Sequence, residues 1–152
     1  MKATVLNADD PKTYALIFDK GDEVVQTLTA FAKEHRLRAA HFTAIGAFSA
    51  VTLGYFDRAK KDYVKIPVTE QVEVLSLVGD VARQDDEPKI HAHVVVGKSD
   101  GTAHGGHLLD GRVWPTLELV LTESARTLAR KSDPESGLAL IDLNATRDTR
   151  AA

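Results

Sequence analysis

Apolar and polar positions follow two different periods along this chain, and each period predicts one kind of element. The run from Tyr14 to Phe18 is almost wholly apolar and stops at Lys20-Gly21, so it predicts a buried strand. Apolar residues then recur at helical spacing, which predicts one main helix that follows an N-cap at Asp22 and ends near Leu37. The apolar face of this helix consists of Val24, Val25, Leu28, Phe31 and Ala32.

Further segments have the length and the β-branched or aromatic composition of strands. They are Ala39 to Ile45, Val51 to Phe56, Tyr63 to Pro67, Val68 to Val81, Thr116 to Leu121 and Leu138 to Leu143. Gly46-Ala47 predicts a break or a bulge between the first two, and Asp57 to Asp62 predicts a hairpin turn. The longest segment is apolar on both faces, which is typical of a strand inside a sandwich, a barrel or a subunit interface.

Polar or turn-forming residues separate these segments. Val113-Trp114-Pro115 predicts a turn, Ser124 to Lys131 a short helix or an extended basic piece, and Met1 to Lys12 an arm or a short edge strand. Asn144 to Ala152 predicts a frayed polar tail. Since no repeat or linker interrupts the 152 residues, we expect a single domain over residues 1–152.

The stretch from Lys89 to Gly111 contains four of the six histidines and is predicted to form a β-hairpin. Its first half carries a run of valines, which favours a strand. Ser99-Asp100-Gly101 then fits a three-residue hairpin loop with glycine at the left-handed position. With this loop, Lys98 pairs with Thr102 across the hairpin.

The register of this hairpin determines which histidines meet. Counting back from the loop places His93 directly opposite His107, and directly opposed residues share a face. His91 lies on that face too, because it is two residues from His93. The register therefore gathers His91, His93 and His107 into one patch and sends His104 to the other face. A one-residue slip at Gly105-Gly106 would remove His107 from the patch.

Three neutral imidazoles in one patch form a ligand set for Zn²⁺ or a similar borderline ion. With no cysteine in the chain, any metal must bind through histidine and carboxylate groups. Three protein ligands also leave a fourth position open, as in catalytic zinc sites. The alternative is that the three histidines are separately satisfied and share no function. We predict a zinc-class site at His91, His93 and His107.

Several motifs resemble the PPC domain (plants and prokaryotes) family. In chain order they are Ile45-Gly46-Ala47-Phe48, Leu53-Gly54-Tyr55-Phe56-Asp57, the run Val72 to Asp80, and then H-A-H, S-D-G and G-G-H-L in the histidine hairpin. The resemblance extends from about Tyr14 to Leu143. It implies a compact α+β domain that is built around a mainly antiparallel sheet and assembles as a homotrimer.

The resemblance also has implications for function. The chain resembles the free-standing prokaryotic members, which implies a metal-binding form with its ligands at His91, His93 and His107. In plants, the domain follows AT-hooks in DNA-binding proteins, and prokaryotic members are labelled predicted DNA-binding proteins for that reason. This chain contains no AT-hook, and the resemblance implies no established reaction.

Composition and charge narrow the function classes. Hydrophobic residues make up 43% and charged residues 27%, which is ordinary for a soluble globular protein. No segment is apolar enough to span a membrane, the first residues do not form a signal peptide, and the lack of cysteine suits the cytoplasm. A net charge of −3 with scattered basic residues disfavours nucleic acid as a partner.

Two more residues are candidates for the chemistry of the site. Glu73 lies between Val72 and Val74 in the longest strand, and a carboxylate with apolar neighbours is a candidate catalytic acid or base. The alternative is a rim glutamate that pairs with an arginine or with backbone amides. His41 is expected to be a packed core or rim histidine, with a role in the pocket as the alternative.

These features support three functional hypotheses. The first is a metalloprotein that binds or converts a small molecule by a polar reaction, because zinc has no accessible redox change. The second is a DNA-binding protein of the PPC type. The third is a structural assembly module in which the histidines are incidental.

Overall fold

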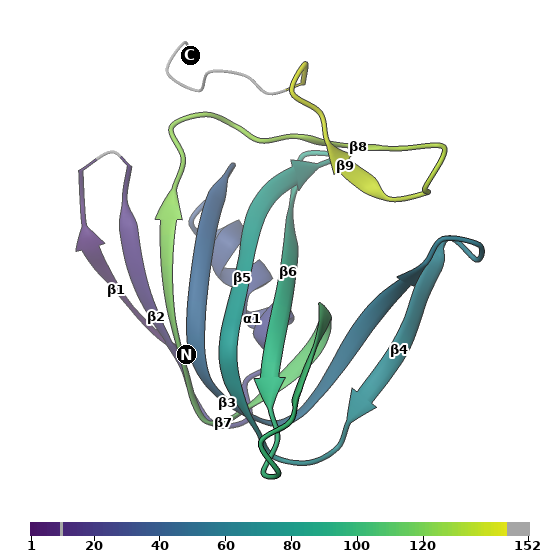
Figure 1. Ribbon diagram of the computed structural model, residues 1–152. Coiled ribbons are helices and arrows are strands. Elements are labelled where there is room, and N and C mark those ends of the chain that lie inside the picture. The colour runs from purple at the N-terminus through teal and green to yellow at the C-terminus, as the bar shows by residue number, and fades with distance from the viewer. Residues whose placement is uncertain (10, 146–152) are drawn as a thin grey trace.

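Strands β3 and β7 form the frame of the fold, because each is long enough to pair with several neighbours. The computed structural model describes residues 1–9 and 11–145, so most of the predicted tail lies outside the described residues. The elements are β1 (Lys2–Asn7), β2 (Thr13–Phe18), α1 (Val24–Glu34), β3 (Ala40–Asp57), β4 (Asp62–Val68), β5 (Val72–Gln84), β6 (Glu87–Gly97), β7 (Ala103–Glu123), β8 (Arg130–Ser132) and β9 (Ala139–Ile141). Figure 1 shows one large curled sheet with α1 behind it.

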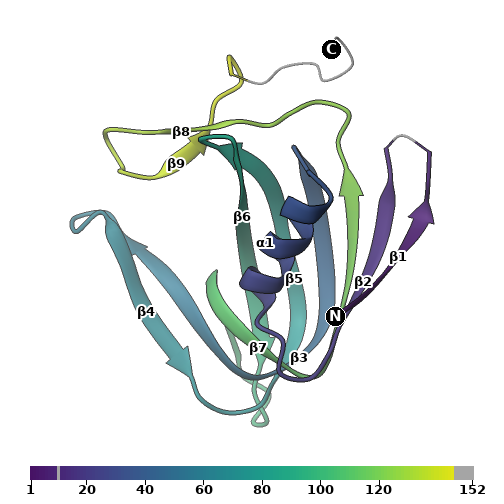
Figure 2. The ribbon, with the colours of Figure 1, turned by 180° about the vertical axis from the view of Figure 1, so that it is seen from behind.

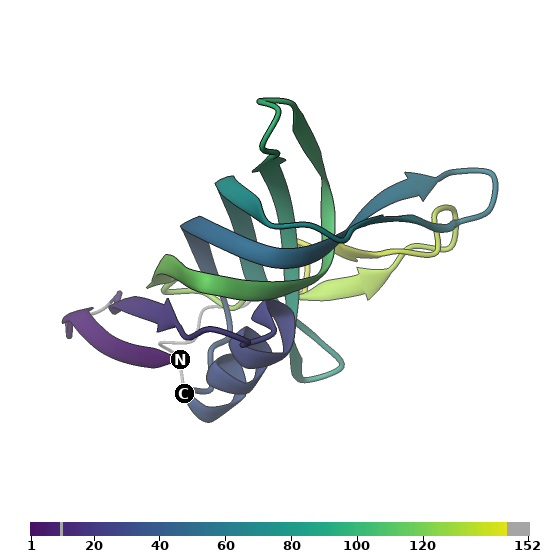
Figure 3. The ribbon, with the colours of Figure 1, turned by 90° about the horizontal axis from the view of Figure 1, so that it is seen from below.

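The large sheet has seven strands in the order β1-β2-β7-β6-β5-β3-β4, and β7 also pairs with β3. Every pairing in it is antiparallel. Residues 103–107 of β7 pair with β6, whereas residues 117–122 pair with β2. Since β3 pairs with both parts of β7, the strands β3, β5, β6 and β7 close into a ring. The curl is visible from below in Figure 3.

The predicted fold class is confirmed: the sheet is mainly antiparallel, and one helix accompanies it among the described residues. The helix follows β2, which corresponds to the predicted first strand Tyr14 to Phe18. The segment Met1 to Lys12 supplies the edge strand β1, which was one of the two predicted forms. No helix of the described residues has the length and apolar character needed to cross a membrane.

Strand β3 joins two segments that the sequence predicts as separate strands. Its register shifts between Ala44 and Gly46, which marks a bulge at the predicted position. Gly46 has a φ of 149°, and a Cβ there would lie 2.4 Å from the backbone oxygen of Thr116 on β7. Glycine is therefore required where β3 bends against β7, and the bulge lets the strand continue instead of ending.

Predictions for the C-terminal part were less accurate. The predicted turn at Val113-Trp114-Pro115 does not form, because β7 continues through these residues. Ser124 to Lys131 is extended and ends in β8, and the core of Leu138 to Leu143 is β9. Strands β8 and β9 pair as a separate two-stranded sheet. In Figures 1 and 2 this C-terminal hairpin lies beyond the ends of β5 and β6.

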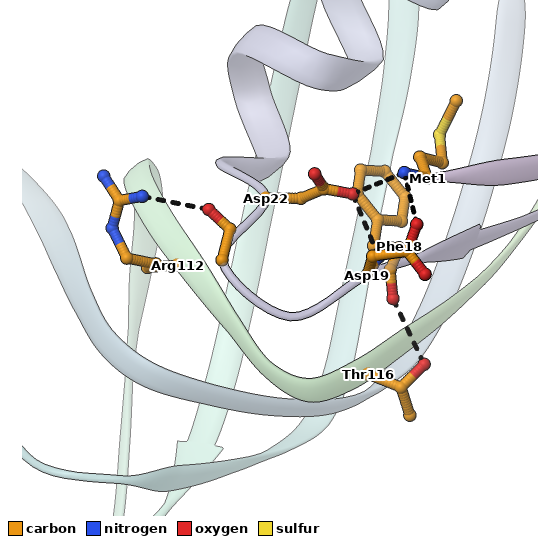
Figure 4. A network of polar contacts seen from close by, with 7 residues as sticks. Met1, Phe18, Asp19, Asp22, Arg112 and Thr116 are labelled. Carbon is orange, nitrogen blue, oxygen red and sulfur yellow. Dashed lines mark hydrogen bonds and ion pairs between the residues drawn. The ribbon is translucent and has the colours of Figure 1, made fainter.

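Helix α1 has Glu23 as its N-cap, which corrects the prediction of Asp22. The Glu23 carboxylate accepts hydrogen bonds from two backbone amides of the first turn at 3.2 and 2.7 Å. Asp22 instead accepts a hydrogen bond from the Asp19 amide and lies 2.8 Å from the amino group of Met1. Figure 4 shows Asp22 directed toward Met1. Glu23 therefore caps the free amides of the first turn, and Asp22 is bound to the segment before the helix.

Strand β7 also anchors the segment that precedes the helix. Arg112 donates a hydrogen bond to the carbonyl oxygen of Gly21 at 2.9 Å. The hydroxyl of Thr116 donates one to the carbonyl oxygen of Phe18 at 3.3 Å (Figure 4). The backbone amide of Gly111 donates to the N-cap carboxylate at 3.1 Å. The start of α1 is thus tied to the strand that carries His107.

The other end of α1 comes earlier than the predicted Leu37, because the helix stops at Glu34. Arg36 has a left-handed φ of 54°, and its amide donates to the carbonyl of Lys33 at 3.1 Å. The amide of Leu37 donates to the carbonyl of Ala32 at 2.9 Å. These two bonds form a Schellman ending, which satisfies carbonyl groups of the last turn and buries Leu37.

The core lies between α1 and the inner face of the curled sheet, and α1 packs against β6 and β7 (Figure 2). The residues that α1 buries are Val24, Leu28, Phe31 and Ala32. On β6, the alternate residues Ala92, Val94 and Val96 are buried in the same core. The residues that alternate with them, His91, His93 and Val95, therefore face away from this core.

Candidate metal centre

Strands β6 and β7 form the predicted hairpin in the predicted register. The amide of Lys98 donates to the carbonyl of Thr102 at 2.9 Å, and Gly101 adopts a left-handed φ of 81° in the loop. His93 lies directly opposite His107. The turn chemistry thus predicted the pairing of two histidines that are 14 residues apart in the sequence.

His91, His93 and His107 form a cluster on one face of this hairpin. One ligand atom of each residue lies within 4.8 Å of the other two. The ring centroids are 5.2 to 5.4 Å apart. His104 is opposite Val96, an odd number of residues from His107, and therefore lies on the other face as predicted. The structure brings the three predicted ligands together.

Glycines let β3 and β4 approach the cluster. A Cβ on Gly106 would lie 2.8 Å from the backbone oxygen of Gly54, which is opposite His107 on β3. A Cβ on Gly54 would lie 2.8 Å from the ring of Tyr63 on β4. With neither Cβ present, the Tyr63 ring stacks on His107 with 4.6 Å between centroids and an interplanar angle of 25°.

One nitrogen of His107 lacks a partner in the described part of the chain. Its Nδ1 atom is buried and makes no hydrogen bond there. A buried polar atom without a partner is costly, and an ion or a water molecule held by an ion would satisfy it. This orphaned nitrogen, within a set of three imidazoles, fits a metal that prefers nitrogen ligands.

His91 is supported by two charged residues from outside the hairpin. Its Nδ1 atom lies 3.6 Å from Oδ2 of Asp80, its cross-strand neighbour on β5. Arg130 on β8 donates from Nη2 to the other carboxylate oxygen of Asp80 at 2.7 Å and lies 3.4 Å from the same His91 nitrogen. The Arg130 side chain is only 7% exposed. With Nδ1 facing this pair, Nε2 of His91 is the nitrogen left for a metal ion.

Burial keeps two of the three rings neutral at pH 7. Burial, and then the charges of neighbouring histidines, Lys89 and Arg130, lower the pKa of His107 to about 4. Burial, followed by the charge of Arg130, also lowers the pKa of His91, although Asp80 opposes the shift. The 3.6 Å contact with Asp80 is therefore made by a neutral ring, and neutral imidazole is the form that binds metals.

A pocket of about 500 Å³ adjoins the cluster. His91 and His107 line it together with Lys89, Arg130 and the ring of Tyr63. Much of the remaining wall is apolar and comes from β6, β7 and the C-terminal hairpin. The pocket has the size and the mixed lining of a small-molecule site.

Glu73, the predicted acid or base, is not near the cluster. It is exposed and opposite Gly97, whereas His93 is opposite Val78, five residues further along β5. This separation is roughly 15 Å at the rise of a strand, which exceeds the reach of proton transfer directly or through one water. Glu73 instead lines a separate groove with the ion pair of Glu70 and Lys98. The placement gives no support to its predicted catalytic role.

His41, the other histidine considered for the pocket, is also outside it. It is exposed on β3, opposite Asp80, and β5 separates it from the cluster. Of the two predicted positions for His41, the exposure excludes the packed core and agrees with the rim. The supporting residues Asp80 and Arg130 were not predicted as site residues, although Asp80 closes a motif that the sequence analysis noted.

In the part of the chain that the structure describes, the fold and the site define a class of proteins with one large antiparallel sheet, one helix and a three-histidine cluster on a central hairpin. The family model of the Plants and Prokaryotes Conserved (PCC) domain matches residues 6–125, and the chain belongs to this family. The match confirms the family resemblance that the motifs indicate.

Two solved structures illustrate the relationship. The metal-containing protein of Archaeoglobus fulgidus is 38% identical, with a TM-score of 0.80, 86% of this chain covered and 93% of that chain. The plant- and prokaryote-conserved (PPC) protein of Pyrococcus horikoshii is 32% identical, with a TM-score of 0.81 and coverage of 93% and 94%. A curated relative, the bifunctional protein GlmU of Synechococcus, is 31% identical over 83% of this chain, which spans only 20% of its length.

Proposed function

We propose that this protein binds one divalent ion of the zinc class through His91, His93 and His107 and holds a small molecule at the open coordination position. The observation that carries the proposal is the approach of one ligand atom from each histidine to within 4.8 Å of the others. The metal-containing nature of the A. fulgidus relative supports it. The orphaned Nδ1 of His107 supports it independently.

The size of the cluster is compatible with tetrahedral coordination. Nitrogens bound to a tetrahedral zinc ion lie about 3.3 Å apart, because Zn–N distances are about 2.0–2.1 Å. The three ligand atoms within 4.8 Å therefore have to move inward slightly. His93 is exposed, whereas Tyr63 stacks on His107 and Asp80 lies beside His91.

A bound zinc-class ion would supply Lewis acidity or a water of lowered pKa, which suits hydrolysis, a lyase step or another polar conversion. The residues of this chain would bind and shield the small molecule. The apolar walls of the adjoining pocket would exclude water, and the Tyr63 ring would fix one side of His107.

Metal analysis of tag-free protein tests the proposal. The parent protein is expected to retain close to one zinc-class ion per chain, and the double variant His91→Ala/His93→Ala to lose it. The matched control is His41→Ala/His104→Ala, which removes two exposed histidines that lie outside the cluster. Equal metal content in both double variants would contradict the proposed ligand set.

The second candidate function, DNA binding, rests on the family resemblance alone. The net charge of −3 and the missing AT-hook weigh against it, because phosphate neutralisation supplies most non-specific affinity. A salt titration of binding to mixed-sequence duplex discriminates the two functions. Micromolar binding with a steep salt slope would favour the DNA-binding function.

We also propose that the protein assembles as a homotrimer through the outer face of its sheet. Apolar side chains are exposed there on neighbouring strands: Ile17, Ile45, Leu75, Val78, Val95 and Val120. A contiguous apolar surface of this kind is typical of an interaction face. The family resemblance favours a trimer as the form in which the surface is covered.

A further inference from the structure

The pocket beside the histidine cluster has a lining of one charge sign. Its charged lining residues are the cations Lys89 and Arg130, and no aspartate or glutamate is among the described residues that line it. The chain as a whole has the opposite bias, with 22 acidic and 19 basic residues. The wall therefore differs in charge from the rest of the protein.

The two cations do not contribute equally. The charge of Arg130 is balanced by Asp80 at 2.7 Å, and its Nη1 atom donates to the carbonyl of Ala139 at 2.9 Å. Lys89 lies two residues before His91 on β6, on the same face, and forms no ion pair within the described residues. Lys89 is thus the uncompensated positive charge of the wall. A divalent ion held by three neutral imidazoles would keep its full charge and add to it.

Most of the other lining residues of the pocket are apolar. Leu108 and Leu109 of β7 line it, and so do Leu138 and Leu140 of the C-terminal segment. The volume of about 500 Å³ is that of a site for a small organic molecule. An occupant therefore meets positive charge at the histidines and hydrocarbon at the leucines.

The number of free donors indicates the kind of anion. Arg130 already donates from Nη1 and Nη2 to protein acceptors, and only its buried Nε lacks a partner, so that single N–H group and Lys89 are the charged donors that remain among the described lining residues. A phosphate group needs several donors for its three oxygens and its charge of nearly two. A carboxylate carries one charge and is satisfied by one cation and a metal position.

We propose that this pocket binds a small organic carboxylate, with the carboxylate at the histidine cluster beside Lys89 and an apolar body between Leu108, Leu109, Leu138 and Leu140. The inference rests on the proposed function, because the metal ion would supply most of the positive charge. It adds the chemical class of the ligand and assigns the C-terminal hairpin to the site. The family match ends at residue 125, so the walls at Leu138 and Leu140 lie outside it.

The experiment uses full-length protein loaded with zinc and titrated calorimetrically with hexanoate, hexanamide, hexylamine and acetate. Hexanoate is expected to bind at least tenfold more tightly than the neutral amide or the amine, which share its chain. It is also expected to bind at least tenfold more tightly than acetate, which lacks the apolar body. Equal affinity for hexanoate and hexanamide, or for hexanoate and acetate, would overturn the proposal.

Two variants and a structural readout locate the binding. Lys89→Gln is expected to weaken hexanoate binding at least fivefold, whereas Lys98→Gln, which removes a cation paired with Glu70 away from the pocket, leaves it unchanged. Hexanoate should shift the methyl NMR signals of Leu108 and Leu138. Shifts confined to other surfaces, or equal losses in the two lysine variants, would overturn the assignment.

The zinc content of the same samples separates the two claims. Protein that loads zinc but shows no preference for hexanoate would contradict the carboxylate proposal and leave the metal site intact. Protein that fails to load zinc contradicts the proposed function and the inference together.

Discussion

At the residue scale, Asp80 is the side chain outside the cluster that bears most directly on a bound metal. It lies 3.6 Å from Nδ1 of His91, and Arg130 holds its other oxygen at 2.7 Å. A carboxylate in this position orients a ligating histidine and raises its basicity. Arg130 in turn fixes the carboxylate, so both act on the metal through His91 and not by direct contact.

We expect Asp80→Asn to weaken zinc affinity by about 10–100-fold, the usual cost of removing such a partner. The amide lacks the negative charge that stabilises the imidazole–metal unit and leaves Arg130 uncompensated. Competition with a chelator of known affinity measures the effect. Glu70→Gln is the control, because it breaks an ion pair of the same length, 2.7 Å, away from the cluster. Equal affinities for the two variants would contradict a positioning role for Asp80.

The low pKa of His107 makes the metal-free protein sensitive to acid. The folded ring protonates near pH 4, but in the unfolded chain the value returns to about 6.5. The unfolded state therefore binds more protons between these values, and stability is lost as pH falls from about 6.5 to about 4. The loss from this group is expected to be about 2 kcal/mol, less than the full shift implies because the ring is partly exposed.

Urea unfolding of the metal-free protein at several pH values measures this loss. His107→Asn should flatten the dependence between pH 6.5 and 4, whereas His104→Asn, on the other face of the hairpin, should keep the parental slope. Parental slopes in both variants would show that His107 is not the group responsible.

The residues of the cluster were predictable because all three belong to one hairpin whose register is set by a three-residue loop. Their supports were not, because the contacts of Arg130 with His91 and Asp80 join positions 39 and 50 residues apart. The distance of Glu73 from the cluster was likewise not evident from the sequence. Its apolar neighbours suggested burial, but strand alternation turns Val72 and Val74 inward and Glu73 outward.

At the element scale, pairing between strands explains why β3 and β7 are long. The close approach of neighbouring strands explains why several positions require glycine. The sequence predicts β3 and β7 as pieces, because Gly46 and Pro115 are ordinary strand breakers. In the folded protein each strand has partners on both sides, and these pairings carry it through the irregular position. Propensity is a local signal, whereas these pairings are made with residues far away in the sequence.

Gly79 on β5 provides a test of this packing. A Cβ there would lie 2.4 Å from the ring of Phe42 and 2.5 Å from the backbone oxygen of His91. Gly79→Ala is therefore expected to lower the free energy of unfolding by at least about 1–3 kcal/mol, the usual cost of overpacking. Gly97→Ala is the control, since its Cβ would meet only the Leu75 side chain, at 3.2 Å. Equal urea midpoints for the two variants would contradict the close approach.

At the scale of the whole molecule, the curled sheet buries its inner face under α1 and leaves an apolar outer face exposed. The two-faced apolar run Val68 to Val81 predicted either a closed sheet or an interface. The ring of β3, β5, β6 and β7 encloses the core, and the apolar residues on the inner face of this run are buried in it. Leu75 and Val78 lie on the exposed outer face of the run, which the homotrimer proposal assigns to contacts between copies of the chain.

Light scattering at micromolar concentration tests the homotrimer. We expect a particle of about three times the chain mass of 16.5 kDa, and dissociation when Val78→Glu places a charge in the apolar face. Thr4→Glu on the exposed edge strand β1 is the control and should keep the parental mass. A parental particle of 16.5 kDa would refute an obligate trimer.

The central claim is that one ion is bound by three histidines of a single hairpin. An anomalous-difference map at the zinc edge, from crystals of tag-free protein loaded with zinc, tests it most directly. The account predicts one peak per chain, about 2.0–2.1 Å from a ring nitrogen of each of His91, His93 and His107. A peak that lacks any of these three ligands, or no peak at the cluster, would contradict it.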